Sequence, residues 1–381
     1  MDEVRMVRER YPEPAPPTAR EIAHAKALLN EPPRRVLPRL GWGLGGVVAA
    51  GAAATVAISL MGGETATTTP PGTVNLDARG AFLAAAANAE RQPIGDYWHS
   101  DVIQGQSYVL RPKTGTYAIS GSLTESFGWW GAKSGMGEGY YGRDLPAHPL
   151  DRDLWRKAGS PSTFRVWSGD SYSTHSTKVT KWQTDGPERG THPRGGGRFL
   201  DGRTVEDLWK LPADPAKLAA LFLNAEQMSA ASGARPGKGP DEVPSGVPIM
   251  RVSSILGTTP LPPKVRAGLM RALATWPGVH TIGRTTDPLG RQGIALAAGE
   301  RATTVKGQDG GPAADRGTYR SREVIVFDER TGALLSRQDV LTRPGGRYAE
   351  MKPGFIIEYS AVRSAEWTAV KPEPPAKLPF G

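Results

Sequence analysis

One uncharged stretch, residues 40–63, constrains this chain more than any other feature. It runs through a Val/Ala-rich segment to Gly63 without a single charged side chain. At about 1.5 Å of rise per residue, a helix of this length reaches roughly 36 Å, whereas the hydrocarbon core of a bilayer is about 30 Å thick. The sequence therefore predicts a single transmembrane helix at 40–63, with a short head at 1–39 and a large C-terminal body beyond it.

The charges beside this stretch predict its orientation. Arg34, Arg35 and Arg39 precede it, whereas Glu64 and an otherwise neutral Thr/Pro segment begin the linker at 64–76. Because cytoplasmic flanks carry the excess of cations, we expect the head in the cytoplasm and the body on the extracytoplasmic side of the cell membrane.

Two other interpretations of the stretch remain open. The run from Arg34 to Arg39 resembles a twin-arginine export signal, in which case the apolar segment would be cleaved off after export. Against this, the head is long and no clean small-x-small cleavage site occurs between Met61 and Ala66. A buried globular helix is the second alternative, although a helix packed at a surface has a polar face and this stretch has none.

Composition limits the chemistry of the body. The chain contains no cysteine, so its fold depends on packing without disulfides or thiolate metal sites. The net charge of +9 favours anionic partners such as phospholipid headgroups or cell-wall polymers. Nucleic acid is not expected as a partner, because no block of Lys and Arg with interleaved aromatic residues occurs.

The body, residues 77–370, has the pattern of an α+β domain. An Ala-rich helix is expected first, then strands separated by Gly, Pro and Ser clusters, then helices, then strands again. This order predicts a curved antiparallel half-barrel sheet with helices packed on one face. The expected strands are 96–110, 116–123, 162–167, 176–183, 279–284, 290–297, 322–328, 333–341 and 355–368; the helices are 77–91, 215–225, 246–256 and 263–276; a Pro-rich tail occupies 371–381.

Aromatic side chains are concentrated in the first group of strands. Six of the ten tryptophans and six of the ten tyrosines lie between Tyr97 and Trp182. Neighbours on a regular strand point to opposite faces, so we expect one member of the Trp129-Trp130 pair to be exposed or in a loop. Most of these aromatics are expected in the core. Five are predicted to line the concave face of the sheet as a ligand site: Trp98, Trp129, Trp130, Trp167 and Trp182.

No pattern in the sequence predicts catalysis, a cofactor or a metal. Gly137-x-Gly139-x-x-Gly142 matches the dinucleotide fingerprint by letters, but residues 143–146 end in proline where a helix would have to begin. The six histidines are scattered without zinc-ligand spacing. Asp151 and Asp153 would share one face of a strand beside basic neighbours that keep them ionised. We therefore expect a protein that is not an enzyme.

Segments spread over most of the chain match a known pattern. They are Met1-Asp2-Glu3-Val4 with Val7-Arg8, the Arg-flanked span, Ala78-Arg79, residues 211–218, 260–263, 276–279, 287–296, 325–332 and 359–362, and Trp367-Thr368, whereas 122–202 matches little. Together they resemble a family of actinobacterial single-pass membrane proteins whose exported part is similar to the lipoprotein carrier LolA and the regulator RseB. The resemblance implies an open, curved sheet closed by helices over an apolar cavity, and a role in lipid binding or sensing. It brings no catalytic residues.

These observations leave three functional hypotheses. The first is a membrane-anchored, non-enzymatic binding or sensory protein whose half-barrel holds a lipid or an apolar peptide. The second is an anti-sigma-like regulator, because Thr18-x-x-Glu21 is a capping box for a short amphipathic helix that would bind a regulatory partner in the cytoplasm. The third is a passive cell-wall-binding module.

Overall fold

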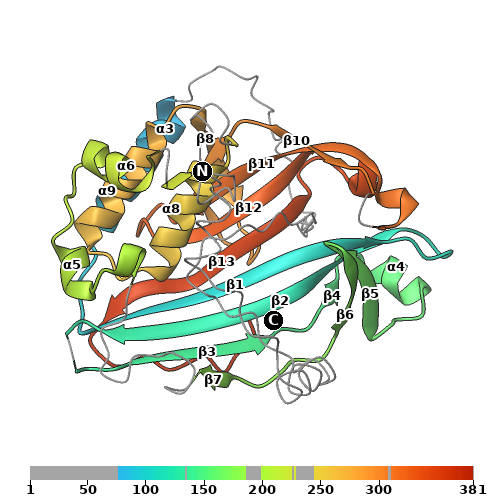
Figure 1. Cartoon of the computed structure of the whole chain (residues 1–381), viewed down its shortest axis with the longest axis horizontal. Helices are drawn as coiled ribbons and strands as arrows, with labels where there is room; N and C mark the ends of the chain where they lie inside the picture. The colour runs from blue at the N-terminus through green and yellow to red at the C-terminus, as the bar shows by residue number, and fades with distance from the viewer. Residues whose placement is uncertain are drawn as a thin grey trace, which may run out of the picture. The chain divides into compact units, whose positions relative to one another are not determined.

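The computed structural model describes residues 76–133, 135–185, 199–224, 227–228, 244–307 and 310–380 (Figure 1). The predicted head at 1–39, the transmembrane helix at 40–63 and nearly all of the linker at 64–76 lie outside these residues and stay predictions. Within the described residues, none of the helices combines the length and the apolar character that crossing a bilayer requires.

A large antiparallel sheet organises the described chain. It has eleven strands in the described segments, with the main order β7-β3-β2-β1-β13-β12-β11-β9-β8, while β4 pairs with β2 and β10 with β11. The first long strand, β1, lies between β2 and the last strand, β13, which joins the two halves of the body. The strands are β1 (Tyr97–Leu110), β2 (Tyr117–Gly131), β3 (Glu138–Asp144), β4 (His148–Pro149), β7 (Gln183–Asp185), β8 (Val279–Thr286), β9 (Gln292–Ala298), β10 (Arg301–Val305), β11 (Gly317–Phe327), β12 (Leu334–Arg343) and β13 (Ile356–Thr368).

Five of the described helices cover one face of this sheet, here called the inner face (Figure 1). They are α3 (Leu76–Glu90), α5 (Val205–Trp209), α6 (Pro215–Phe222), α8 (Val247–Thr258) and α9 (Pro263–Ala274). The Asp214 carboxylate accepts a hydrogen bond from the Lys217 N–H at 2.9 Å, and Pro215 then fixes the first turn of α6. The predicted α+β class, a curved antiparallel sheet with helices on one face, is confirmed.

The remaining elements gather beside the sheet. A two-stranded hairpin consists of β5 (Thr163–Ser168) and β6 (Ser171–Ser176), and α4 (Arg152–Lys157) precedes it. Three one-turn helices, η2 (Leu200–Gly202), η4 (Ala313–Asp315) and η5 (Gly346–Tyr348), lie in connecting segments.

The main hydrophobic core lies between the inner face and the helices. Ile325 and Phe327 of β11 point into it, and the Phe82 ring of α3 meets the Phe327 ring edge-on at 5.5 Å. The intervening Val324 and Val326 belong to a smaller cluster on the opposite face, here called the outer face. The continuous apolar run of β11 therefore reflects a strand that is covered on both sides, as its sequence predicts.

Both members of the Trp129-Trp130 pair are buried, so the expectation that one is exposed or in a loop is wrong. They do point to opposite faces of β2, with Trp130 in the inner core and Trp129 on the outer face. The segment after β13 covers Trp129 there, with the Lys371 ammonium 4.3 Å from the ring centre. The tail thus supplies a cover that the sequence does not predict.

Two local predictions are wrong because side chains bind the backbone. The expected strand at 176–183 is absent, because residues 177–182 connect the end of β6 to the start of β7. Ser176 Oγ accepts a hydrogen bond from the Lys178 N–H at 3.0 Å and turns the chain there. Asp151 and Asp153 do not share a strand face, because Asp151 is the N-cap of α4 and accepts a hydrogen bond from the Asp153 N–H.

Candidate functional site

Two of the five predicted site residues, Trp98 and Trp130, are core residues on the inner face. The Trp98 ring meets the Trp367 ring at 5.6 Å, and the Arg266 guanidinium of α9 lies 4.9 Å from the Trp98 ring centre. Trp130 donates its indole N–H to Tyr140 Oη at 2.7 Å. Both rings are almost fully buried, so no ligand reaches them while the surrounding side chains stay in place.

The other three predicted residues lie in separate places. Trp129 is on the outer face, and Trp182 donates its indole N–H to the Pro375 carbonyl of the tail at 3.1 Å. Trp167 lies in the β5–β6 hairpin, where its ring meets the Tyr172 ring edge-on at 5.0 Å. The structure therefore does not bring the five tryptophans together, and Trp167 is the one that borders the groove described below.

Side chains fill the layer in which the half-barrel prediction places a ligand. Phe82, Phe222, Leu269 and Phe327 have no solvent-exposed surface between the inner face and the helices. Because protein interiors of this kind are close-packed, a ligand bound there would have to displace these side chains.

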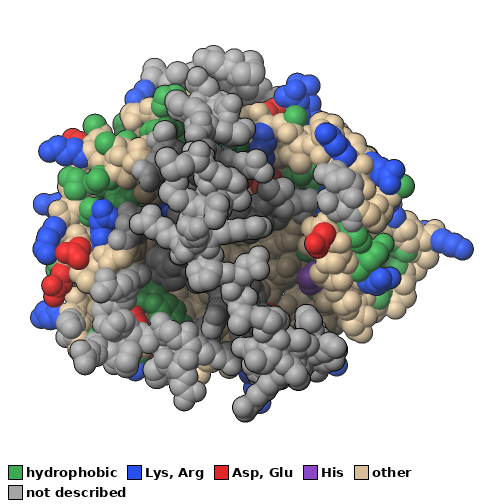
Figure 2. Space-filling model, viewed as in Figure 1, with side chains coloured by type: hydrophobic (Ala, Val, Ile, Leu, Met, Phe, Trp, Pro, Cys, Tyr) green, Lys and Arg blue, Asp and Glu red, His purple; other side chains and the backbone are tan. Residues whose placement is uncertain are grey.

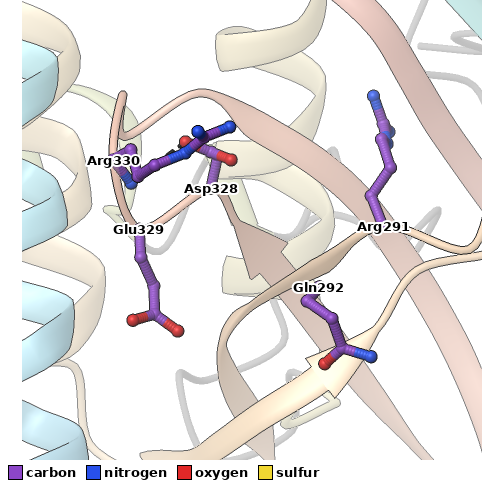
Figure 3. A pocket seen from close by; sticks show the side chains of 5 residues that line it. All are labelled: Arg291, Gln292, Asp328, Glu329 and Arg330. Atoms are coloured by element: carbon purple, nitrogen blue, oxygen red, sulfur yellow. Dashed lines mark hydrogen bonds between the residues drawn. The ribbon is translucent and has the colours of Figure 1, made fainter.

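One surface hollow lies at the turn after β11. Figure 3 shows Arg291 and Gln292 at the start of β9, with Asp328, Glu329 and Arg330 in the turn. Its acidic and basic groups have structural partners: Arg291 donates to the Asp287 carboxylate at 2.8 Å, and Glu329 accepts from Arg284 at 2.7 Å. Asp328 accepts hydrogen bonds from backbone N–H groups of the turn. The arrangement stabilises the turn, and we do not assign a ligand to it.

A second hollow, here called the Trp167 groove, has a volume of about 210 Å³. It lies between the end of β1, the β5–β6 hairpin and the segments of η4 and η5. Six side chains set its chemistry: Tyr108, Leu110, Arg165, Trp167, Tyr172 and Arg347.

One wall of the Trp167 groove is aromatic and open to solvent. Tyr172 is 49% exposed, and the Arg165 guanidinium lies 3.9 Å from the centre of its ring. The buried Tyr108 donates its hydroxyl hydrogen to Gln106 Oε1 at 2.8 Å. Aromatic rings of this kind give a ligand a large contact area, while their hydroxyl groups and the stacked guanidinium add polar character.

The opposite wall is held in place by Arg111 at the end of β1. Its guanidinium donates to Glu350 at 2.8 Å, to Asp315 at 3.0 Å and to the Arg347 carbonyl at 2.8 Å. The hydrogen bond from Arg111 lowers the pKa of Glu350, which keeps that carboxylate charged at neutral pH. These bonds fix η4 and η5 against β1, so the groove is formed without a ligand.

Arg347 is the unusual residue of the groove. It is only 6% exposed, its Nε has no hydrogen-bond partner, and among the described residues no carboxylate forms an ion pair with it. The neighbouring Tyr348 hydroxyl is also buried beside this guanidinium, and burial raises the pKa of Tyr348 well above its usual value. An unsatisfied buried donor costs about 1–3 kcal/mol and more when charged, so an acceptor group in the groove would be stabilised there.

A cluster of buried and half-buried charges lies on β10, β11, β12 and β13. Its members are Arg301, Glu323, Arg337, Asp339 and Glu358. Arg301 pairs with Asp339 and lies 3.4 Å from Glu323, whose other oxygen is 3.5 Å from Arg337. Burial raises the pKa of Glu323 to about 7 and raises that of Asp339. The carboxylates of this cluster are committed to Arg301 and Arg337, which leaves Arg347 without an anionic partner.

The place of Tyr172 opposite Trp167 follows from a local sequence pattern, whereas no local pattern predicts that Arg347 lines the groove. Gly169-Asp170 is a two-residue turn of the kind that closes a hairpin, and it sets Tyr172 directly opposite Trp167. Arg347 reaches the groove only through the hydrogen bond between Arg111 and its carbonyl, which joins residues 236 positions apart. No group of three or more His, Cys, Asp or Glu side chains in the described segments is placed to hold a metal ion.

Distant structural likenesses to solved proteins include LprF and the MucA/MucB complex. LprF from Mycobacterium bovis matches with 8% identity and a TM-score of 0.23, over 80% of this chain and 99% of that one. The MucA/MucB complex of Pseudomonas aeruginosa matches with 11% identity and a TM-score of 0.20, over 76% of this chain and 58% of that one. TM-scores of this size do not establish a shared fold. No protein-family model matches the sequence, and no curated protein matches it.

Proposed function

We propose that this chain is a membrane-anchored, non-enzymatic binding protein whose extracytoplasmic domain holds a short acidic and aromatic peptide segment in the Trp167 groove. The observation that carries the proposal is an aromatic wall, formed by the half-buried Trp167 and the exposed Tyr172, beside Arg347, which lines the groove and has no ion pair with a carboxylate of the described residues. The anchor is the uncharged stretch at 40–63, and a LolA- or RseB-like half-barrel is the fold to which we assign the sheet and its helices.

The size of the groove favours a peptide over a lipid. At about 30 Å³ for each water-sized group, 210 Å³ holds roughly seven such groups, which is the size of one or two side chains. Cavities that enclose whole small ligands are larger, about 300–1,000 Å³. The layer between sheet and helices, where an acyl chain was expected, is filled by Phe82, Phe327 and their neighbours.

The charges of the groove favour an acidic segment. Arg165 and Arg347 both line it, and a planar guanidinium binds a carboxylate through two parallel hydrogen bonds. On the face seen in Figure 2, the Lys and Arg side chains are scattered around the described surface instead of forming one patch. A local carboxylate contact therefore explains the basic groove better than attraction to a long polyanion such as a wall polymer.

The test compares three labelled hexapeptides that alternate Phe with Glu, Gln or Lys. They are titrated by fluorescence anisotropy against the full chain in nanodiscs. We expect the Glu peptide to bind at least ten times more tightly than the Lys peptide. Arg347→Met should weaken the Glu peptide about tenfold, which corresponds to the loss of one charge-assisted hydrogen bond of about 1.4 kcal/mol.

Lys352→Met is the matched control, because Lys352 is an exposed cation five residues beyond Arg347 and does not line the groove. If Arg347→Met does not fold, Arg165→Met provides the same test at an exposed position. Equal affinity for all three peptides contradicts the proposal. So does native mass spectrometry that shows one phospholipid bound to each chain and not displaced by the Glu peptide.

A further inference from the structure

The Pro-rich segment 369–380 lies against the outer face of the sheet. The residues that it contacts there do not line the Trp167 groove. The Pro375 carbonyl accepts the indole N–H of Trp182 at 3.1 Å. The Lys377 carbonyl accepts hydrogen bonds at 3.2 Å from both Arg143 and Arg363. Indole and guanidinium groups of the sheet thus donate to carbonyl groups along the tail.

One apolar side chain of the tail accompanies these bonds: the half-buried Phe380 packs against the outer-face cluster that contains Leu123 and Leu145. The Phe380 ring lies 5.0 Å from the His148 ring, and Lys371 lies over the Trp129 ring. None of the described tail residues is fully buried, and Val370 is 76% exposed. The tail therefore rests on the outer face without becoming part of the core.

The surface beneath the tail is held together by its own side chains. Glu125 is fully buried and accepts hydrogen bonds from both Arg143 and Arg363. Arg363 also lies 3.7 Å from Asp101, and the Arg143 guanidinium lies 4.3 Å from the Trp182 ring centre. Because these pairs fix the donors in position, the surface is expected to persist when the tail leaves it.

Donors on aromatic and basic side chains that bind carbonyl groups of a proline-rich segment are the chemistry of polyproline recognition. Residues 371–375 of the tail run without a bend, whereas the chain bends at 376–377 and 379. A polyproline II segment has no internal hydrogen bonds, so its carbonyls are free to accept, and its ordering costs little entropy. The tail carries Pro372, Pro374, Pro375 and Pro379 within nine residues of sequence.

We propose that the outer surface formed by Trp129, Arg143, Trp182 and Arg363 is a binding site for an extended proline-rich segment of a partner protein. The chain's own residues 371–380 occupy this site in cis and compete with the partner. This site lies apart from the Trp167 groove, so it stands whether or not the groove binds a peptide.

The test uses a fluorescein-labelled synthetic peptide of residues 369–380. It is titrated against the full chain and against the same chain ending at Val370, both in nanodiscs. We expect saturable binding to the truncated chain and at least tenfold weaker binding to the intact chain. Trp182→Phe in the truncated chain should weaken the peptide about three- to tenfold, because the ring remains and the indole N–H is lost. A peptide with Pro374→Ala and Pro375→Ala should bind several times more weakly.

Three results would overturn the proposal. The first is a truncated chain with an unchanged circular dichroism spectrum that does not bind the peptide. The second is equal binding to intact and truncated chains. The third is a dimer of the intact chain that disappears on truncation, which would assign the surface to the tail of a second copy. If the truncated chain does not fold, Phe380→Ala in the intact chain replaces it, and failure of that variant to bind more peptide than the wild type also overturns the proposal.

Discussion

The two faces of the sheet are covered in different ways. Packed helices cover the inner face, and they add large apolar side chains such as Phe82 and Leu269 to the core. The C-terminal tail lies on part of the outer face, and its main contribution is backbone carbonyl groups that accept hydrogen bonds from Trp182, Arg143 and Arg363. The inner cover contributes to the stability of the domain, whereas the outer cover is the one that we propose a partner segment can replace.

Both faces nevertheless bury a cluster of arginines and carboxylates. The inner cluster centres on Glu323, which lies against the backbone of Gly246 at the start of α8. The outer cluster centres on Glu125, which is paired with Arg143 and Arg363. Buried charges of this kind cost desolvation energy and are tolerated only when they are paired. The two faces therefore differ in their covers: helices lie over the inner face, and the C-terminal tail lies over part of the outer face.

The largest expected effect tests the inner cover. Phe327→Ala removes a fully buried ring that packs against Phe82 of α3, and it should lower the free energy of unfolding by about 3–5 kcal/mol. Urea unfolding followed by tryptophan fluorescence measures this loss. Leu83→Ala on the same helix is the control, because Leu83 is 42% exposed and its loss should stay within about 0.5 kcal/mol. If the two variants lose the same free energy of unfolding, the packing of the helices on the inner face would not be what stabilises the domain.

The elements that form the inner core can be predicted from the sequence, because the patterns that encode them are local. Pro215 after Asp214 starts α6, and the run from Val324 to Phe327 reports a strand covered on both sides. The tail was predicted to be Pro-rich, but composition does not say where an extended segment lies. The hydrogen bond between Trp182 and Pro375 joins residues 193 positions apart, and no local pattern encodes it.

The second expected effect tests the buried charges of the outer face. Arg143→Met leaves the fully buried Glu125 with Arg363 as its remaining ion-pair partner, so the free energy of unfolding should fall by about 3 kcal/mol. Adding Glu125→Gln to this variant should restore part of the loss, because the uncompensated charge is then removed. A double variant that is less stable than Arg143→Met would contradict this explanation.

The third effect is a pH dependence that both faces share. Burial raises the pKa of Glu323 to about 7, and burial together with Glu125 raises the pKa of Asp101 to about 7. The native state therefore binds these protons more tightly than the unfolded state, whose carboxyls titrate near pH 4. Stability from this source is complete below the unfolded pKa and is lost as the pH rises to about 7, with a contribution of up to about 3 kcal/mol per group.

Variants at the two faces separate these contributions. Glu323→Gln and Asp101→Asn should each flatten the fall in unfolding free energy between pH 4 and pH 7. Truncation after Val370 should change only the part that depends on Asp101, because the tail contacts Arg363, whose Nε lies 3.7 Å from that carboxyl, whereas Glu323 lies on the inner face. If the unfolding free energy of both point variants falls as steeply with pH as that of the wild type, groups other than Glu323 and Asp101 are responsible.

The candidate groove was predictable only where it depends on one hairpin. Trp167 was among the predicted site residues, and its cross-strand partner Tyr172 follows from a two-residue turn. The other predicted tryptophans were placed by assuming one aromatic concave face, but Trp98 and Trp130 serve the core while Trp129 and Trp182 contact the tail. Arg347 was missed because distant residues bury it, and burial is a property of the folded chain.

The smallest expected effect tests how the hydrogen bond from Trp182 keeps the tail on the outer face. Trp182→Phe removes the indole N–H that binds the Pro375 carbonyl, a hydrogen bond with a net contribution of about 0.5–1.5 kcal/mol. Global unfolding should change little, whereas trypsin cleavage after the exposed Lys377 of the tail should become up to about tenfold faster.

Trp129→Phe is the matched control, because the Trp129 indole N–H is buried and has no hydrogen-bond partner. The Phe ring can still contact Lys371, so the rate of tail cleavage should stay close to that of the wild type. Equal acceleration in both variants would mean that ring packing holds the tail. No acceleration in either would mean that neither the Trp182 hydrogen bond nor the Trp129 ring controls the release of the tail.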